Sequence, residues 1–430
     1  MFVSSSYCQS ALARRFWSKF VLFSSLALAH VATASSTGQP LDFREAIARA
    51  ELDAPGVTAR AAAVSAASAR VGPAGELPDP ELLVGIDNLP VTGSDAFEWN
   101  RDFMTMRKIG VMQALPRREK RALRRERAEA DSAKERALLL TTQLSTRESV
   151  ARAWTTVANA ERRLVLGLSM RAQADAMVCA ATAAISAGRG STADAIAAQQ
   201  ARVALEDRIA AIQLARDRAR IALARWLPND AERPIGKSPN WREVPVGGLS
   251  DPDRIAAHRE LHAYEAIARA ARTDIALARA EKRSDWSVEL AYADRGPHLS
   301  SMLSVQFRVG LPLFAASRQD PLIAANEAVL LQIESEREAA AREHRAELVQ
   351  MEAIWRASVD RADRYEQQLL PLGDERIEAA LASYRGGSGA LQDVLTAFDA
   401  AIEQRLAYID VMDSLGESWA ALRFAFPEGN

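Results

Sequence analysis

The sequence predicts a mainly helical protein with a small β part and an internal two-fold repeat. Residues 117–187 contain no Pro and a single Gly, which indicates one very long helix. Two pairs of short runs with alternating character, at about 81–115 and about 285–313, indicate strands. The repeat is indicated because Pro116 and Pro312, which close the second run of each pair, lie 196 positions apart.

Local patterns justify the remaining elements in order. Residues 322–370 lack both Pro and Gly, and in the last segment apolar residues recur every three or four positions, as on one face of a helix. Segments of this length are typical of coiled-coil packing. We therefore expect a first repeat over residues 35–227, a linker over residues 228–250 that is rich in Pro and Gly, and a second repeat over residues 251–430.

Composition limits the possible functions. Lys and Arg number 54 against 56 Asp and Glu, so the net charge of −2 gives no general reason to expect a nucleic-acid partner. The two cysteines, Cys8 and Cys179, are too few for a disulfide scaffold or a Cys-rich zinc module. No phosphate loop and no Ser-His-Asp order stands out, so we expect neither an enzyme nor a bound cofactor.

Residues 1–34 have the features of a secretory signal peptide. Arg14, Arg15 and Lys19 precede an apolar stretch, residues 20–34, that ends in Ala-Thr-Ala. The stretch is too short for a spanning helix, and the alternative is an uncleaved membrane anchor. Beyond Ala34 no uninterrupted run of about 18 apolar residues occurs, so we expect no transmembrane helix in the remaining chain.

Four strands in one chain raise a problem of closure. A four-stranded sheet has two open edges, and open edges do not occur in lipid. The smallest single-chain membrane barrels have about eight strands. Strands in a membrane would therefore require several chains to close one barrel, whereas a soluble protein would cover each strand pair with helices.

Several segments together resemble a known family. They are LDFREAIARA at Leu41, AGELPDPEL at Ala74, the two strand pairs, and two Gly-to-Asp turns 199 positions apart. The chain resembles the TolC-type outer-membrane factors, which are the exit ducts of tripartite efflux pumps. The run DNLPV at Asp87, followed by RDFMTMRKIGVMQALPRREKR at Arg101, is similar to the CzcC-like branch of heavy-metal resistance-nodulation-division systems.

This resemblance implies an architecture and a set of partners. The family forms homotrimers in which twelve strands close a β-barrel in the outer membrane, and a coiled-coil barrel of long helices extends into the periplasm. The implied partners are a periplasmic adaptor, an inner-membrane resistance-nodulation-division pump and outer-membrane lipid. The implied activity is passive export of heavy-metal cations in a Gram-negative bacterium, without nucleic acid.

Other functions remain open at the level of the sequence. Within the same class, the duct would carry organic toxins or a type I secreted polypeptide. From a different class, a periplasmic coiled-coil adaptor would also be exported and helical. An adaptor usually has one helical hairpin flanked by small β-domains, whereas this chain has two hairpins and two strand pairs.

The resemblance also identifies a gate at the periplasmic tip, where two helix turns meet. A ring of acids from three chains would attract cations there. The alternative is that the two Asp residues only cap helices. Gly389 departs from the family pattern, because some relatives carry a basic residue at that position. The candidate gate residues are Gly188, Arg189, Asp194, Tyr384, Gly387 and Asp393.

A basic run begins where a strand would leave the membrane. Its candidate residues are Arg117, Arg118, Lys120 and Arg121. Such side chains would either contact lipid phosphates or form a solvated helix face.

The remaining metal-type residues are weaker candidates. His258 and His262 are four apart on an expected helix, a spacing that suits one metal, but packed or solvated histidines are the favoured interpretation and we expect no metal site. Met104, Met106 and Met112 would suit a soft metal, and packing toward lipid is favoured. Cys179 is expected to be buried.

Overall fold

The computed structural model describes residues 38–188, 190–243 and 255–427. The expected signal peptide and Arg189 lie outside the described residues. Contacts divide the chain into two units, Met1–Gln39 and Pro40–Asn430, and the architecture below is that of the second.

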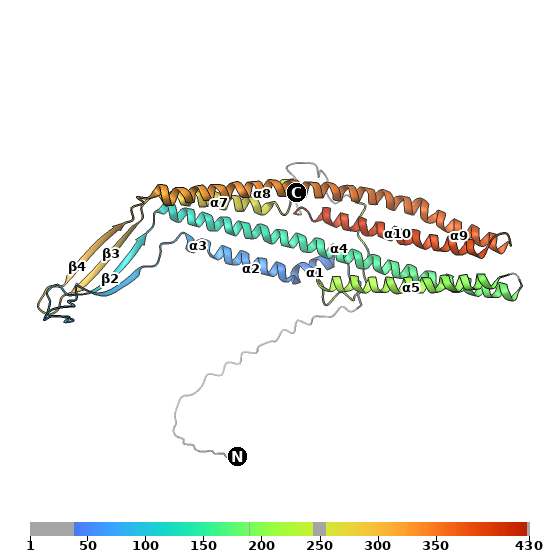
Figure 1. Cartoon of the computed structure of the whole chain (residues 1–430), viewed down its shortest axis with the longest axis horizontal. Coiled ribbons are helices and arrows are strands. Elements are labelled where there is room, and N and C mark those ends of the chain that lie inside the picture. The colour runs from blue at the N-terminus through green and yellow to red at the C-terminus, as the bar shows by residue number, and fades with distance from the viewer. Residues whose placement is uncertain (1–37, 189, 244–254, 428–430) are drawn as a thin grey trace, which may run out of the picture. The chain divides into compact units, whose positions relative to one another are not determined.

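The first half of this unit has three short helices, two strands and two long helices. The short helices pack along the first long helix, α4, which follows directly on strand β2 (Figure 1). The elements are α1 (Phe43–Asp53), α2 (Pro55–Ala69), α3 (Val71–Ala74), β1 (Glu81–Asp87), β2 (Met106–Leu115), α4 (Arg118–Ser186) and α5 (Thr192–Ala224).

The second half follows a similar order. A helix precedes two strands, and a long helical segment then returns as a hairpin. The elements are α7 (His262–Ala280), β3 (Trp286–Asp294), β4 (Met302–Val309), α8 (Ala315–Arg364), η1 (Tyr365–Leu369), α9 (Leu370–Arg385) and α10 (Leu391–Arg423). Within this unit the strands lie at one end of the helices, and the α4–α5 and α9–α10 turns lie at the other end (Figure 1). Both expected strand pairs and the expected 117–187 helix are confirmed.

The segment 322–370 is less uniform than its lack of Pro and Gly predicts. Between α8 and α9 the backbone makes one π-turn, in which the N–H of Leu370 bonds to the carbonyl of Tyr365. Pro371 follows at the start of α9. Proline has no N–H and its ring collides with the carbonyl four residues earlier, so the wider π-turn lets the helix continue past it.

The four strands form one antiparallel sheet in the order β1-β2-β3-β4. Strands β2 and β3 join the two halves, with Gly110 opposite Ala291. A Cβ on Gly110 would lie 2.8 Å from the Cβ of Ala291, so this close pairing requires glycine. Within the described sheet β1 and β4 each pair on one side only, and both are edge strands.

The register separates the side chains into two unlike faces. One face is mostly apolar and includes Leu82, Val84, Ile86, Ile109, Val111, Leu290, Tyr292, Leu303, Val305 and Phe307. The opposite face is polar or small and includes Lys108, Gly110, Glu289, Ala291, Ser304, Gln306 and Arg308. Most of the apolar side chains are exposed in the single chain, and Val84 and Leu303 are exposed by 73% and 71%.

The main hydrophobic core lies where α4 passes α1 and the segment after α5. Trp154 is fully buried, donates its indole N–H to the carbonyl of Leu41 at 3.0 Å, and meets Phe43 edge-on at 5.4 Å between ring centroids. Trp355 donates to the carbonyl of Trp241 at 2.9 Å. The described part of the expected linker, residues 228–243, therefore packs into the core, and the repeat boundaries themselves stay a prediction.

Candidate functional site

The α4–α5 turn is built around two glycines. Gly188 has a φ of +69°, and its N–H bonds to the carbonyl of Ile185 at 2.9 Å. The N–H of Gly190 bonds to the carbonyl of Ala184 at 3.0 Å. A left-handed residue after a helix is typical of a Schellman-like ending, and glycine adopts it without a steric cost.

The α9–α10 turn has the same backbone pattern, shifted by 199 positions. Gly387 has a φ of +76° and bonds to the carbonyl of Tyr384 at 3.1 Å, and Gly389 bonds to the carbonyl of Ser383 at 3.1 Å. A Cβ on Gly389 would lie 2.9 Å from the Cβ of Ser383. The tight turn therefore has no room for the basic side chain that some relatives of the resembled family carry here.

The two candidate acids cap the helices that leave these turns. Asp194 accepts from the Ser191 N–H at 3.1 Å, and its own N–H donates to the Ser191 hydroxyl at 3.1 Å, which completes a capping box. The hydrogen bond from the Ser191 hydroxyl, with that from its N–H, holds the pKa of Asp194 below its usual value. Asp393 accepts from the Ala390 N–H at 3.2 Å, but Ala390 has no side-chain acceptor to reciprocate.

The helices behind both turns pack together. A small core beneath them contains one residue from α4, one from α5 and three from α10: Ala181, Ala198, Leu391, Val394 and Leu395. Tyr384 is partly buried and packs against this core. The structure thus brings the two turns to one end of the bundle with both acids at least partly exposed, while Arg189 lies outside the described residues.

Lys120 is buried, whereas the sequence predicts that the side chains of the basic run contact lipid or are solvated. It is 1% exposed, and its ammonium group lies 2.8 Å from Asp285 and 3.0 Å from Glu281 and donates to the carbonyl of Arg283. Lys120 therefore joins the start of α4 to the segment before β3. Its partners are more than 160 positions away, so no local pattern in the sequence points to them.

The other members of the run have separate environments. Arg117 donates to the carbonyl of Ser284 at 2.8 Å, and Arg121 makes a long contact of 3.4 Å with the carbonyl of Gly75. Arg118 is exposed. Of the four candidates, Arg117 and Arg118 are the exposed ones and match a solvated face or a lipid contact.

The two histidines do not share a helix. His258 lies in a turn, and α7 begins at His262. His258 is buried and stacks on His344 with ring centroids 4.4 Å apart. Burial, with the nearby His344 and Arg259, lowers the pKa of His258 to about 3, so it is neutral at physiological pH. Among the described residues no group of three or more His, Cys, Asp or Glu side chains could hold a metal ion.

Two further expectations about side chains are wrong. Met106 and Met112 lie opposite Asp87 and Glu81, on the polar face of the sheet rather than the apolar face. Cys179 is exposed. It faces away from Ala181 and its neighbours because the bundle covers only one side of this part of α4.

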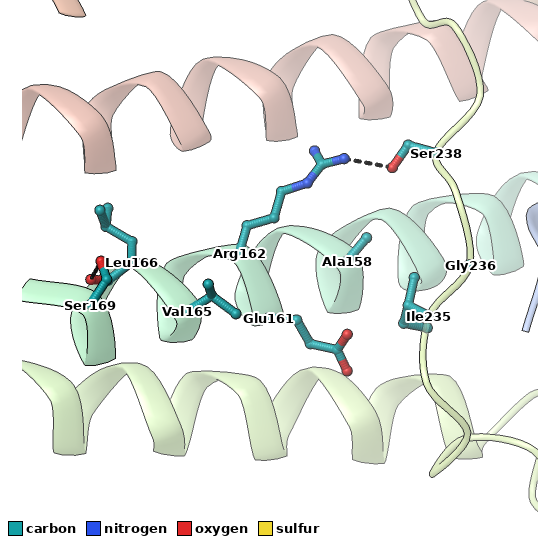
Figure 2. Close-up of a pocket in the computed structure, with 9 residues that line it drawn as sticks. All are labelled: Ala158, Glu161, Arg162, Val165, Leu166, Ser169, Ile235, Gly236 and Ser238. Carbon is teal, nitrogen blue, oxygen red and sulfur yellow. Dashed lines mark hydrogen bonds between the residues drawn. The ribbon is translucent and has the colours of Figure 1, made fainter. Parts of the chain in front are cut away.

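A groove of about 520 Å³ runs along α4 beside residues 235–238 (Figure 2). Arg162 crosses it and donates to the hydroxyl of Ser238 at 2.8 Å. Glu161 lies on the same stretch of α4 and forms an ion pair with Arg220. Most of the other lining side chains are apolar or small, so the groove presents no nucleophile with an adjacent base.

No protein-family model matches the sequence, and no curated protein matches it. Among solved structures, the chain is similar to a membrane protein from Pseudomonas aeruginosa, with a TM-score of 0.77 at 16% identity over 89% of both chains. It is similar to CusC, with a TM-score of 0.77 at 15% identity over 93% of this chain and 96% of CusC. It is also similar to the outer membrane protein VceC from Vibrio cholerae, with a TM-score of 0.74 at 17% identity over 89% of this chain and 96% of VceC.

The chain has the fold of these membrane proteins. The likeness extends over about nine tenths of the chain. At such low identity it establishes the fold alone. The expected mainly helical architecture with a small β part is confirmed at that level.

One described helix meets the length and composition of a membrane span. An 18-residue window of α4 has a mean hydropathy of 1.2, contrary to the expectation that no such segment follows residue 34. Helix α4 has 69 residues and is about 100 Å long at about 1.5 Å per residue, more than three times the thickness of a hydrocarbon core. Composition alone is weak support for a span in a helix of this kind.

Replacing Lys120 by Met should destabilise the protein by about 1–2 kcal/mol at pH 7. Removing one partner from a fully buried ion pair costs about 3–5 kcal/mol, and the expected loss is smaller here because both acids are partly exposed. Burial raises the pKa of Asp285, but the hydrogen bonds from Lys120 and the Arg117 N–H outweigh it and lower the pKa below the usual 3.8. This stabilisation is therefore present above pH 3.8 and is lost as the pH falls below that value.

Urea unfolding of Lys120→Met and wild type at pH 7 and pH 3 measures this difference. Arg118→Met, an exposed position two residues earlier, is the matched control and should change little at either pH. An equal loss for Lys120→Met at both pH values would show that the carboxylate of Asp285 is not the partner that matters.

Proposed function

We propose that the chain is one subunit of a homotrimeric outer-membrane channel that serves as the exit duct of a tripartite efflux pump. Residues 1–34 would direct export and be removed. Three copies would close a barrel of twelve strands in the outer membrane, with the long helices in the periplasm. The duct would be passive and would receive its cargo from a periplasmic adaptor and an inner-membrane pump.

The two-faced, open-edged sheet carries this proposal. Its apolar face is uncovered, and among the described elements no helix packs over it. A water-soluble sheet would bury such a face, whereas the outer surface of a membrane barrel exposes it to lipid. The unpaired edges of β1 and β4 then require neighbouring strands, because backbone groups in lipid must be satisfied.

Exposed apolar side chains on the helices support association of several chains. Ile196, Val203, Leu214 and Ile221 follow one another on α5 at spacings of 7, 11 and 7, and each is exposed by at least 51%. These spacings keep the side chains on one stripe, as in a coiled-coil seam. A second set of exposed apolar residues on α8, η1 and α9, namely Val349, Ile354, Leu369 and Leu372, provides a surface for the neighbouring chain.

The internal two-fold repeat is supported by the two turns. Their backbone hydrogen bonds and positive-φ glycines coincide at the same offset of 199 positions. Such agreement suits a duplicated helix-strand-strand-helix unit in which each half supplies one hairpin of the barrel and one helical hairpin. In the trimer the two kinds of turn would alternate around the tip, as the candidate gate requires.

Native mass measurement in detergent should find a trimer. The double variant Ile196→Glu/Val203→Glu should dissociate at lower detergent concentration, because carboxylates would be buried in the seam. Leu52→Glu, at an α1 position that is 81% exposed, is the control and should leave the trimer intact. A stable monomer that keeps its full β content would overturn the proposal.

Heavy-metal cations are the proposed cargo, on the basis of the resemblance over residues 101–121. Deleting the gene should increase sensitivity to heavy metals more than to dyes or antibiotics. Complementation with the intact gene is the control. Sensitivity to dyes and antibiotics that equals or exceeds the metal effect would favour organic toxins as cargo, and a secretion defect alone would favour a polypeptide.

The tip acids are proposed to line the narrowest part of the duct. Asn at positions 194 and 393 keeps an oxygen that can accept the capping N–H but removes the charge. Single-channel recording should therefore show reduced cation selectivity in the double Asp194→Asn/Asp393→Asn variant, and in the matching double Ala variant. If the Asn variant conducts like wild type and only the Ala variant is altered, the acids act as helix caps.

A further inference from the structure

The exposed aromatic side chains of this protein occur in one region. Among the described residues, the large aromatics that stand exposed all belong to the sheet, its connecting loop or the residue before α8: Phe97, Trp99, Phe103, Trp286, Tyr292, Phe307 and Phe314. The described aromatics of the helical part are buried, as are Trp154 and Trp355, or partly buried, as is Trp226. Aromatic rings are enriched at both water interfaces of membrane proteins, where one part of the ring is apolar and another is polar.

These aromatics form two groups at opposite ends of the strands. Trp286 begins β3, and Phe314 follows β4, at the end nearest the helices. Tyr292 lies nearer the other end, opposite Ile109, and the β1–β2 loop with its three aromatics follows at that end. Strand β3 has nine residues. A tilted strand that crosses a bilayer needs about 9–11 residues, so the length of β3 fits such a crossing.

A charged pair marks where the apolar face ends. Arg107 and Asp294 lie opposite each other on that face, at the loop end, and their side chains are 2.5 Å apart. Lipid tails would not accommodate this pair, so the interface with water begins at its level. The β1–β2 loop, which carries Phe97, Trp99 and Phe103, begins just beyond this level.

The β1–β2 loop holds its aromatics in a preformed arrangement. Phe97 has a φ of +63°, a costly conformation for a bulky residue, and its N–H bonds to the carbonyl of Pro90 at 2.8 Å. Asp102 accepts the N–H of Met104 at 2.6 Å, and Arg295 donates to the carbonyl of Phe103 at 2.6 Å. Phe97, Trp99 and Phe103 are nevertheless exposed by 66%, 54% and 64%.

We infer that this loop is a membrane anchor, in which Phe97, Trp99 and Phe103 insert into the lipid headgroup layer beside the barrel. The inference rests on the proposed outer-membrane location. The occupant is lipid because the loop continues directly from the apolar face that lipid would cover. The loop also carries three acids, Asp95, Glu98 and Asp102, against Arg101. Aromatic insertion rather than attraction to anionic lipid therefore supplies the contact, and zwitterionic phosphatidylcholine should be sufficient.

Quenching of tryptophan fluorescence in phosphatidylcholine vesicles tests the anchor. The contribution of Trp99 is obtained by subtracting the emission of Trp99→Phe from that of the wild type, and those of Trp286 and Trp226 in the same way. Bromine at the 6,7 positions of the lipid chain should reduce the Trp99 contribution by about twofold, as it should for Trp286. Trp226, at the end of α5 and away from the sheet, is the control and should be unaffected.

A second variant separates anchoring from folding. Phe97→Gly removes one ring at a position whose positive φ glycine adopts freely, so the loop should fold at least as well. It should nevertheless weaken the quenching of Trp99 by bromolipid and increase its quenching by aqueous acrylamide.

The outcomes distinguish a failure of the loop anchor from a failure of the proposed outer-membrane location. Quenching of Trp286 but not of Trp99 by bromolipid would overturn the anchor and leave the membrane barrel in place. A Trp99 shielded from both quenchers would mean that the loop packs on a neighbouring chain, which also overturns the anchor. If none of the three tryptophans is quenched by lipid and the protein fails to sediment with vesicles, the outer-membrane location itself fails.

Discussion

The backbone hydrogen bonds left open at the two edges of the sheet are the constraint on which the rest of the structure depends. Among the residues that the structure describes, strands β1 and β4 each pair on one side only. Their remaining N–H and C=O groups need partners, and the exposed apolar face restricts where those partners can be. The proposed closure by identical copies would satisfy both demands, and it would require each chain to present matching surfaces along its helices as well. The apolar stripe on α5 fits this requirement.

The core around Trp154 fixes the position of these surfaces. It joins α4 and α1 to the segment after α5, and Trp241 of that segment accepts a hydrogen bond from Trp355 of α8. One cluster therefore connects the helices of both halves midway between the strands and the turns. Lys120 performs a similar role closer to the sheet, where its contacts with Glu281 and Asp285 tie α4 to the entry of β3.

Features with a local cause could be predicted from the sequence. The strands follow from period-two alternation, the 69-residue α4 from the absence of breakers, and the turn glycines from their recurrence at one offset. Features that depend on distant partners could not. Lys120 is buried by acids more than 160 positions away, and His258 is stacked on His344, which no spacing rule connects to it. The burial predicted for Cys179 was wrong because the two sides of an Ala-rich helix differ little in hydrophobicity.

The π-turn between α8 and α9 has a consequence for how the helical part can change over evolution. A π-turn holds one more residue than an α-turn, so it rotates everything that follows by about 100° about the helix axis. Helices α8 and α9 form one continuous rod, yet their side chains follow two separate angular frames that meet at Tyr365–Leu369. Deleting one residue within η1 would restore an ordinary α-turn and leave α9 facing the same neighbours, whereas a deletion elsewhere in α8 or α9 would turn the residues that follow by about 100°. The junction at η1 is therefore the point of this rod where the loss of one residue disturbs the packing of the two helices least.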